Sequence, residues 1–498
     1  MPEKRAQPHA EKWYDYILKE NAYGVAAQVV VFLAGLLVTI TFPRILGTEG
    51  FGYFSLALVT ANAAMFFADF GIFNVLLRMM PVGMREGNAQ RYYAMFRAWK
   101  LALAFLSSSA LFLASDFLAG AVFKAAPLAP ALKLAAGYLF LYALYTFYDY
   151  YFISLKKNKF SLAISIAYNL LRFLLPLAVF LLISPDFYGF LAGTIAALAL
   201  SVLASSFLAR GIRLPSKPHE LNMEEVKRLL FYGSLSYLAG NLLIYSDTLA
   251  VGILLPASDV GIYRVAWLWA TASAFLLPFS LRTFSSIHAY ESMEKSAKII
   301  SATFKYTVML VFLMLLGILA VSDKFLVLFY GPEFAVAYPI LGVLSLMLFD
   351  MALSPIFSSL FIGKGYLGKP TTVGLASGAI LIALLATLTP AYGLMGAAAS
   401  IVAARTLNLF GTAWLAMRLA KFRLSPSLVL KPALAALASF LILKSFLPLT
   451  GLLNALILGF ASVALYGIAL ILLRGIELNE IESMLRGALG RRVRKPAS

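Results

Sequence analysis

Long apolar stretches alternate with short polar ones along the whole chain. A helix needs about 20 mainly apolar residues to cross the hydrocarbon core of a membrane, and stretches of that length recur from beginning to end. We predict spans near 22–43, 51–77, 101–122, 132–153, 160–183, 187–208, 231–255, 260–281, 303–322, 338–362, 371–389, 393–417, 430–448 and 452–473. The pattern therefore predicts an all-α integral membrane protein with about 14 transmembrane helices.

The composition agrees with this assignment. Of the 498 residues, 61% are hydrophobic and only 13% are charged, whereas a soluble domain is about half apolar and about a quarter charged. The chain therefore belongs to the membrane class before any motif is considered.

Basic residues are distributed unevenly between the loops. Most of the 41 Lys and Arg residues fall in the N-terminal segment, in every second loop and at the C-terminus. Because basic residues are retained on the cytoplasmic side, this predicts a multi-pass protein of the cell membrane with both termini in the cytoplasm. The net charge of +18 is then a topology signal, so no nucleic-acid partner is expected.

The loops are short, and one polar linker divides the chain. We predict two related six-helix lobes followed by two extra helices. The expected boundaries are a cytoplasmic tail or interfacial helix at 1–21, an N-lobe at 22–210, a linker at 211–230, a C-lobe at 231–418, two further spans within 419–474, and a basic cytoplasmic tail at 475–498.

A short internal repeat supports related lobes. Gly52 follows the junction of the first two spans, Gly261 follows the junction of the seventh and eighth, and an aromatic residue follows each within two positions. An even number of helices per repeat predicts a pseudo-twofold axis along the membrane normal.

Ionisable residues inside the spans are the main functional candidates, because such groups usually face a cavity or a partner. Four arginines occur there (Arg78, Arg172, Arg264, Arg405), together with four aspartates (Asp69, Asp149, Asp247, Asp350). Arg172 and Arg405 lie mid-span with no carboxylate nearby in sequence, which favours a cavity role in binding an anion. The alternative is that each arginine pairs with an aspartate and fixes helix packing. The aspartates are candidates for ion coupling or salt bridges, and Asp247 is the leading one.

Enzyme chemistry finds no support in the sequence. There is no cysteine, and the three histidines are scattered, so we expect no metal site. The segment 363–369 resembles a phosphate-binding loop, but Pro370 replaces the required Ser or Thr. The triplet 69–71 resembles a kinase motif but lies inside a predicted span.

Several segments together resemble the polysaccharide transporter (Wzx-type) oligosaccharide flippases of the multidrug/oligosaccharidyl-lipid/polysaccharide (MOP) exporter superfamily. They occur in the order of that family: FPRILGTEGFGYFSLA at 42–57, ADFG at 68–71, YSDTLAVG at 245–252, VGIY at 260–263, LFYGPEF at 328–334 and YGLMGAAA at 392–399.

The resemblance implies a fold like that of the MATE multidrug exporters, alternating access, and flipping of a polyprenyl- or dolichyl-(pyro)phosphate-linked oligosaccharide to the outer leaflet. Membrane lipids are the other expected partners, and the protein is expected to act as a monomer. No cofactor is implied beyond a coupling ion, H⁺ or Na⁺. The headgroup would bind in a central cavity lined by Arg172, Arg405, Arg264, Arg78, Asn169 and Asn408.

Three alternatives stay open. A multidrug or cation antiporter of the same superfamily would favour a cavity rich in carboxylates, and a lipid II-type flippase would share the phosphate. A membrane glycosyltransferase or ligase would need large outer loops with catalytic acids, and the sequence has none.

Overall fold

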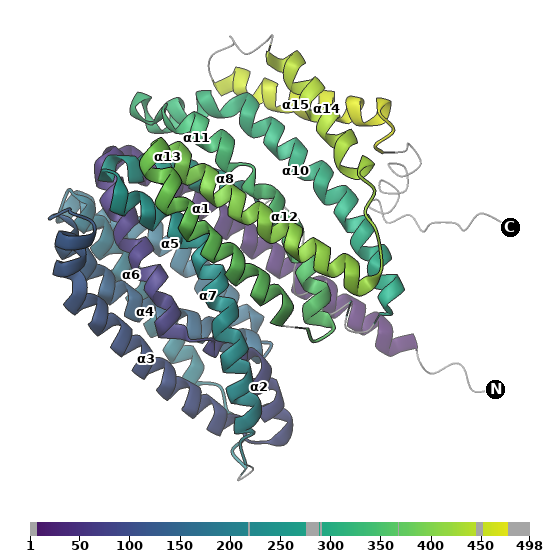
Figure 1. Cartoon of the computed structure of the whole chain (residues 1–498). Coiled ribbons are helices and arrows are strands. Elements are labelled where there is room, and N and C mark those ends of the chain that lie inside the picture. The colour runs from purple at the N-terminus through teal and green to yellow at the C-terminus, as the bar shows by residue number, and fades with distance from the viewer. Residues whose placement is uncertain are drawn as a thin grey trace, which may run out of the picture. The chain divides into compact units, whose positions relative to one another are not determined.

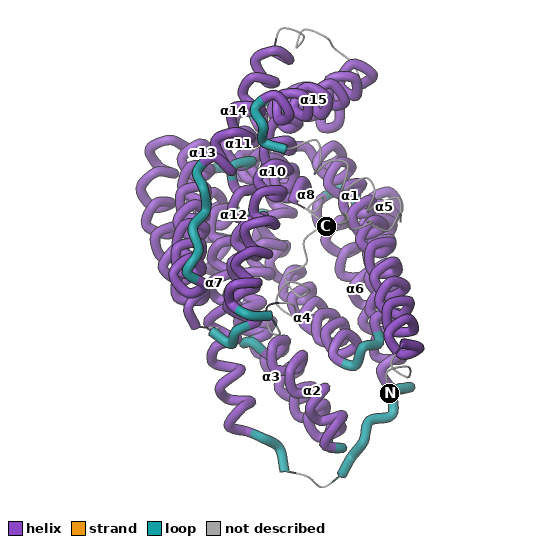
Figure 2. Tube along the Cα trace, turned by 90° about the vertical axis from the view of Figure 1, so that its right-hand side faces the viewer, coloured by secondary structure: helices purple, strands orange, loops and turns teal. Residues whose placement is uncertain are grey.

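The computed structural model describes residues 7–217, 220–274, 288, 291–366, 368–444 and 452–476. Every element in these ranges is a helix, and no strand occurs among them (Figure 2). The predicted all-α class is therefore confirmed. Most of the basic tail predicted at 475–498 lies outside the described residues, as do the C-terminal ends of the spans predicted at 260–281 and 430–448.

The chain divides into two compact units. Unit 1 comprises Met1–Leu268 and Thr371–Ala404, and unit 2 comprises Trp269–Pro370 and Arg405–Ser498. Unit 1 contains α1 (Gln7–Asp69), α2 (Ile72–Glu86), α3 (Ala89–Phe117), the short π-helix Leu118–Val122, α4 (Leu128–Ser154), α5 (Asn158–Leu182), α6 (Phe187–Arg210), α7 (Met223–Leu254), most of α8 (Ala257–Ala274) and the middle of α13 (Gly368–Ala420).

Unit 2 contains the C-terminal end of α13 and most of the helices after α8. These are α10 (Met293–Tyr330), the 3₁₀ turn Pro332–Phe334, α11 (Ala337–Leu344), α12 (Met347–Gly363), α14 (Ser427–Lys444) and α15 (Leu452–Leu472). Within this unit, α14 and α15 pack on α10 and on each other (Figure 1).

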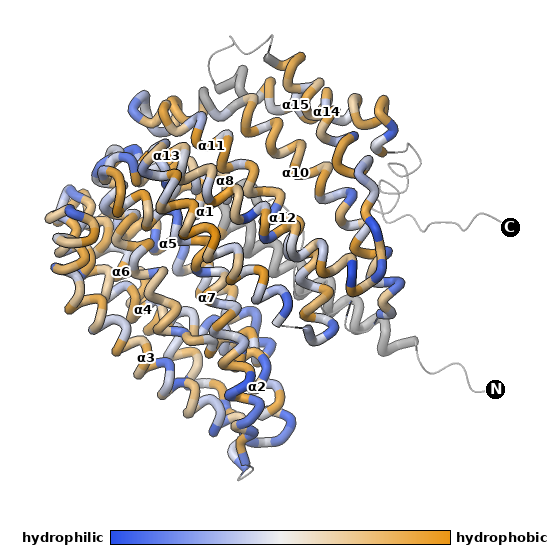
Figure 3. Tube along the Cα trace, viewed as in Figure 1, coloured by the Kyte–Doolittle hydropathy of each residue, from blue (hydrophilic) through white to orange (hydrophobic). Residues whose placement is uncertain are grey.

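Among the described residues, nine helices are long and apolar enough to cross a membrane. Two of them, α1 and α13, each contain two predicted spans joined through a kink. Gly47 in α1 has φ 67° and Gly393 in α13 has φ 57°, a left-handed conformation that glycine adopts without a steric penalty. Two further apolar helices, Ser427–Leu443 and Ile457–Leu472, are shorter, and most of their length has the hydrophobic colour in Figure 3.

The span predicted at 51–77 is interrupted in the structure. Helix α1 ends at Asp69, and α2 begins at Ile72 after Phe70 and Gly71, which have φ values of 44° and 80°. A Cβ atom on Gly71 would lie 2.6 Å from the backbone nitrogen of Ser234, so α7 passes directly over the break. Residues on both sides of this turn are buried, so the apolar pattern continues through it. The pattern therefore contains no sign that the helix ends here.

Gly52 and Gly261, the repeat-related glycines, meet within unit 1. A Cβ on Gly52 would lie 1.8 Å from the carbonyl oxygen of Ala257, and a Cβ on Gly261 would lie 2.0 Å from that of Thr48. Thr48 and Ala257 have the same separation in sequence as the two glycines. The contact is therefore made twice, by two pairs of residues with the same separation in sequence.

We expect Gly261→Ala to destabilise the protein, because the new methyl group must displace a backbone carbonyl rather than a side chain. Overpacking of this kind costs about 1–3 kcal/mol. Gly137→Ala is the matched control, since a Cβ added there would meet nothing within 4 Å and alanine favours the helix. Thermal unfolding in detergent should show a lower midpoint for the first variant only. Equal midpoints would contradict the tight crossing.

Candidate functional site

Arg172 lies in the middle of α5 among tyrosine side chains. It lies close to four phenol groups, those of Tyr138, Tyr142, Tyr145 and Tyr168, and the residue is partly exposed. No ion pair joins Arg172 to a carboxylate in the part of the chain that the structure describes. A mid-span guanidinium without an acidic partner is costly unless it meets an anion.

Arg264 lies on α8 and rests on an aromatic ring. Its guanidinium carbon is 4.1 Å from the ring centroid of Trp267, a favourable cation–π geometry. One guanidinium nitrogen, Nη1, is buried and has no hydrogen-bond partner among the described residues. Arg264 is also close enough to Arg172 for the two charges to interact. The two cations therefore belong to one neighbourhood of unit 1, and we call them the arginine pair.

Asp247 is an acid whose charge acts on Arg264. Its side chain is fully buried. The hydroxyl of Tyr263 donates to one carboxylate oxygen at 2.9 Å, and the backbone N–H of Thr248 donates to the other at 2.7 Å. The carboxylate of Asp247 therefore offsets part of the positive charge at Arg264.

Arg405, in unit 2, has a different environment from the one expected. Its Nη1 donates to Asp350 at 3.1 Å, and both side chains are buried. Asn408 donates to the other oxygen of Asp350 at 2.8 Å, and the hydroxyl of Ser354 donates to the same carboxylate. The charge of Arg405 is thus neutralised by α12, and two predicted cavity residues, Arg405 and Asn408, are engaged with a predicted coupling aspartate.

A buried ion pair that sequence reasoning did not identify lies at the end of α1. Lys100 on α3 donates to Asp69, and the side chains are 1% and 6% exposed. The distribution of basic residues groups Lys100 with the basic cluster of the preceding cytoplasmic loop. Its position at the start of the apolar part of α3 was the available signal.

The remaining predicted residues have ordinary local contacts. Arg78 forms a 3.5 Å ion pair with Glu225, and its side chain is 65% exposed. Asp149 accepts a hydrogen bond from Ser161. The amide of Asn169 donates to the carbonyl of Ser165 at 2.8 Å within the same helix.

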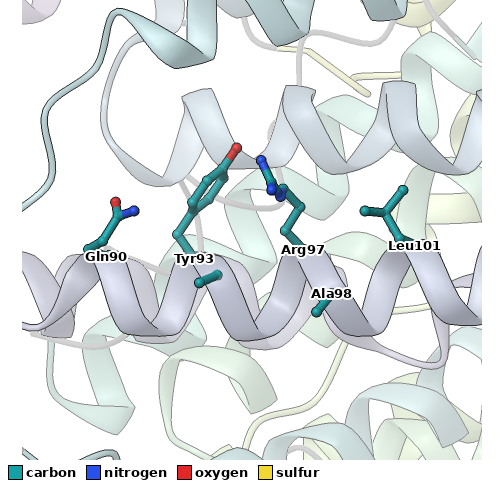
Figure 4. Close-up of a pocket in the computed structure, with 6 residues that line it drawn as sticks. Gln90, Tyr93, Arg97, Ala98 and Leu101 are labelled. Carbon is teal, nitrogen blue, oxygen red and sulfur yellow. The ribbon is translucent and has the colours of Figure 1, made fainter.

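The described ranges contain no candidate metal site. No group of three His, Cys, Asp or Glu side chains gathers there as a metal site would require. A groove of about 200 Å³ runs along α3 and is lined by Gln90, Tyr93, Ala94, Arg97, Ala98 and Leu101. Arg97 lies beside the ring of Tyr93 at 5.8 Å (Figure 4). All six residues come from one helix, and none of them belongs to the arginine pair.

The comparisons with known proteins agree on one class. The family model described as "Polysaccharide biosynthesis protein" matches residues 17–280. The probable low-salt glycan biosynthesis flippase Agl15 of Haloferax volcanii is 27% identical over 164 residues, which cover 32% of this chain. The match spans only a third (33%) of that relative's length.

Solved structures share the fold. The lipid II flippase MurJ in an inward closed conformation aligns over 95% of this chain and 100% of its own, with a TM-score of 0.71 and 14% identity. A MATE family multidrug transporter of the MOP superfamily, facing inward, aligns over 79% of this chain and 95% of its own, with a TM-score of 0.59 and 15% identity. The predicted MATE-like fold is confirmed.

Proposed function

Because the chain belongs to the polysaccharide biosynthesis protein family, we propose that it is a flippase of the MOP superfamily. Its substrate is an oligosaccharide joined through phosphate or diphosphate to a polyprenyl or dolichyl lipid. The protein carries this lipid from the cytoplasmic to the outer leaflet of the cell membrane by alternating access, as a monomer with both termini in the cytoplasm. It is a transporter, not an enzyme.

The observation that carries the proposal is the arginine pair, Arg172 and Arg264. Neither has an ion-pair partner in the described ranges, and Asp247 is the acid whose charge acts on Arg264. Guanidinium groups stay protonated when buried and match phosphate oxygens with a planar fork. An anionic headgroup would supply the missing charge.

The charge balance also separates the competing functions. A cationic drug would be repelled by two arginines in one neighbourhood, which disfavours a cation antiporter. A lipid II-type flippase would carry the same diphosphate, so the arginine pair alone fits both lipids. The drive is proposed to be an H⁺ or Na⁺ gradient or the membrane potential.

Reconstitution into proteoliposomes tests the proposal. A fluorescent polyprenyl diphosphate that carries a short oligosaccharide is incorporated, and an impermeant reductant quenches the outer leaflet. We expect the protein to increase the quenched fraction beyond that of empty vesicles, because inner-leaflet lipid reaches the outer surface. Quenching identical to that of empty vesicles would refute the flippase function.

A further inference from the structure

Tyrosines gather in the middle of the unit 1 helices, away from the membrane interfaces where tyrosine is normally enriched. Tyr138, Tyr142 and Tyr145 follow one another at helical spacing on α4, whose ends are Leu128 and Ser154. The ring centroids of the first two are 5.3 Å apart with nearly parallel planes, and those of the next two are 6.2 Å apart. We call these three residues, with Tyr168 and Tyr245, the tyrosine array.

The other two members come from neighbouring helices. Tyr168 on α5 places its ring 4.7 Å from that of Tyr145, and α5 packs beside α4 in unit 1 (Figure 1). Tyr245 on α7 lies near Tyr138 and near Arg264. The array therefore extends from the surroundings of Arg172 to those of Arg264.

The hydroxyl groups of the array lie near other polar side chains. Tyr138 has Asn62 on α1 and Tyr168 close to it, and Tyr145 has Ser165. Burying a hydroxyl in an apolar environment has a cost that phenylalanine would avoid at equal ring size. Packing alone therefore gives no reason for phenols at these mid-span positions.

Among the four tyrosines of α4 and α5, Tyr142 is the member best placed to meet a ligand. It retains partial accessibility, whereas Tyr138, Tyr145 and Tyr168 are each less than 10% exposed. Arg172 and Tyr245 are also partly accessible. The partly accessible members thus combine flat aromatic faces, phenol hydroxyls and a guanidinium group.

We propose that the tyrosine array binds the sugar residue next to the lipid phosphate, while the arginine pair holds the phosphate. This inference rests on the proposed function. A pyranose ring has an apolar C–H face that packs on an aromatic ring, and its hydroxyls exchange hydrogen bonds with phenols and amides. The substrate class is therefore a lipid whose phosphate carries a saccharide, recognised by both parts.

The test compares two probes that bind to the full chain in detergent micelles. One is a polyprenyl diphosphate with a short oligosaccharide, and the other is the same polyprenyl diphosphate without sugar. We expect Tyr142→Leu to weaken binding of the glycosylated probe about tenfold and to leave the bare probe unchanged. Tyr142→Phe keeps the ring and should give a smaller loss, again for the glycosylated probe only.

Tyr392→Leu is the matched control, since that tyrosine is 69% exposed and lies outside the array; it should change neither affinity. Equal weakening of both probes by the position-142 variants, or no weakening of either, would overturn the sugar-binding role while the flippase function stands. A wild-type protein that binds neither probe would instead refute the proposed function. The Phe variant preserves ring packing, so the result does not depend on the Leu variant folding.

Discussion

Flipping of the lipid-linked oligosaccharide is expected to fall at least about tenfold when Arg172 is replaced by alanine, and Arg264→Ala should have a similar effect. Each substitution removes charge-assisted hydrogen bonds worth about 1.5–3 kcal/mol each, which is roughly a 10- to 100-fold change in an equilibrium constant. Arg172→Lys should retain part of the activity, because it keeps the charge and loses the fork. The proteoliposome quenching assay measures all three variants.

Two other arginines provide controls for this result. Arg78→Ala should leave flipping unchanged, because its pair with Glu225 is exposed and such pairs contribute little. Arg405→Ala should lower the thermal midpoint, because it leaves the carboxylate of Asp350 buried without its cation. Full transport by the Arg172→Ala/Arg264→Ala double variant would exclude the anion-binding role.

The largest stability effect is expected from Lys100→Met. This change leaves Asp69 buried without its counter-charge, and breaking a buried pair in this way costs about 3–5 kcal/mol. The thermal midpoint in detergent should fall markedly. Lys295→Met is the matched control. Its ion pair with Glu291 is exposed, so its loss should leave the thermal midpoint nearly unchanged.

A second substitution, at Asp69, shows whether the loss of stability comes from breaking the ion pair. Lys100→Met/Asp69→Leu removes both charges, and apolar replacements of a buried pair are often neutral or stabilising. We therefore expect the double variant to regain most of the lost stability, with a coupling energy that a double-mutant cycle measures. Additive losses would show that Lys100 and Asp69 act independently.

The helices were largely predictable from the sequence, because the membrane permits few alternatives for a long apolar stretch. The breaks were harder to predict. Helix continues on both sides of Gly47 and Gly393, where the pattern indicates only separate spans, whereas Phe70 and Gly71 end a helix within an apolar run. A local pattern does not reveal such a turn, because it depends on what packs over it, as α7 packs over Gly71.

The pairing of charges was not predictable from sequence spacing. Arg172 and Arg405 looked equivalent, since both are mid-span arginines without a nearby acid in sequence. Only the packing of α12 against the end of α13 places Asp350 beside Arg405, 55 positions away in the chain. The same limitation hid Lys100, whose partner lies across a helix break.

The tyrosine array could have been recognised in part. The spacing of Tyr138, Tyr142 and Tyr145 places them on one helix face, which the sequence alone indicates. Their association with Tyr168 and Tyr245 needed the arrangement of three helices. Aromatic residues are so common in this chain, which has 25 tyrosines, that no single one stood out.

The junction of Gly52 and Gly261 joins main chain to main chain, with no side chain between them. Such a junction has no rotamers to reset, so its two surfaces can separate and come together again without any search for the correct fit. The two contacts lie side by side, since a Cβ on either glycine would also come within 3.3 Å of the backbone nitrogen of the other. A methyl group at one glycine would therefore open both contacts together.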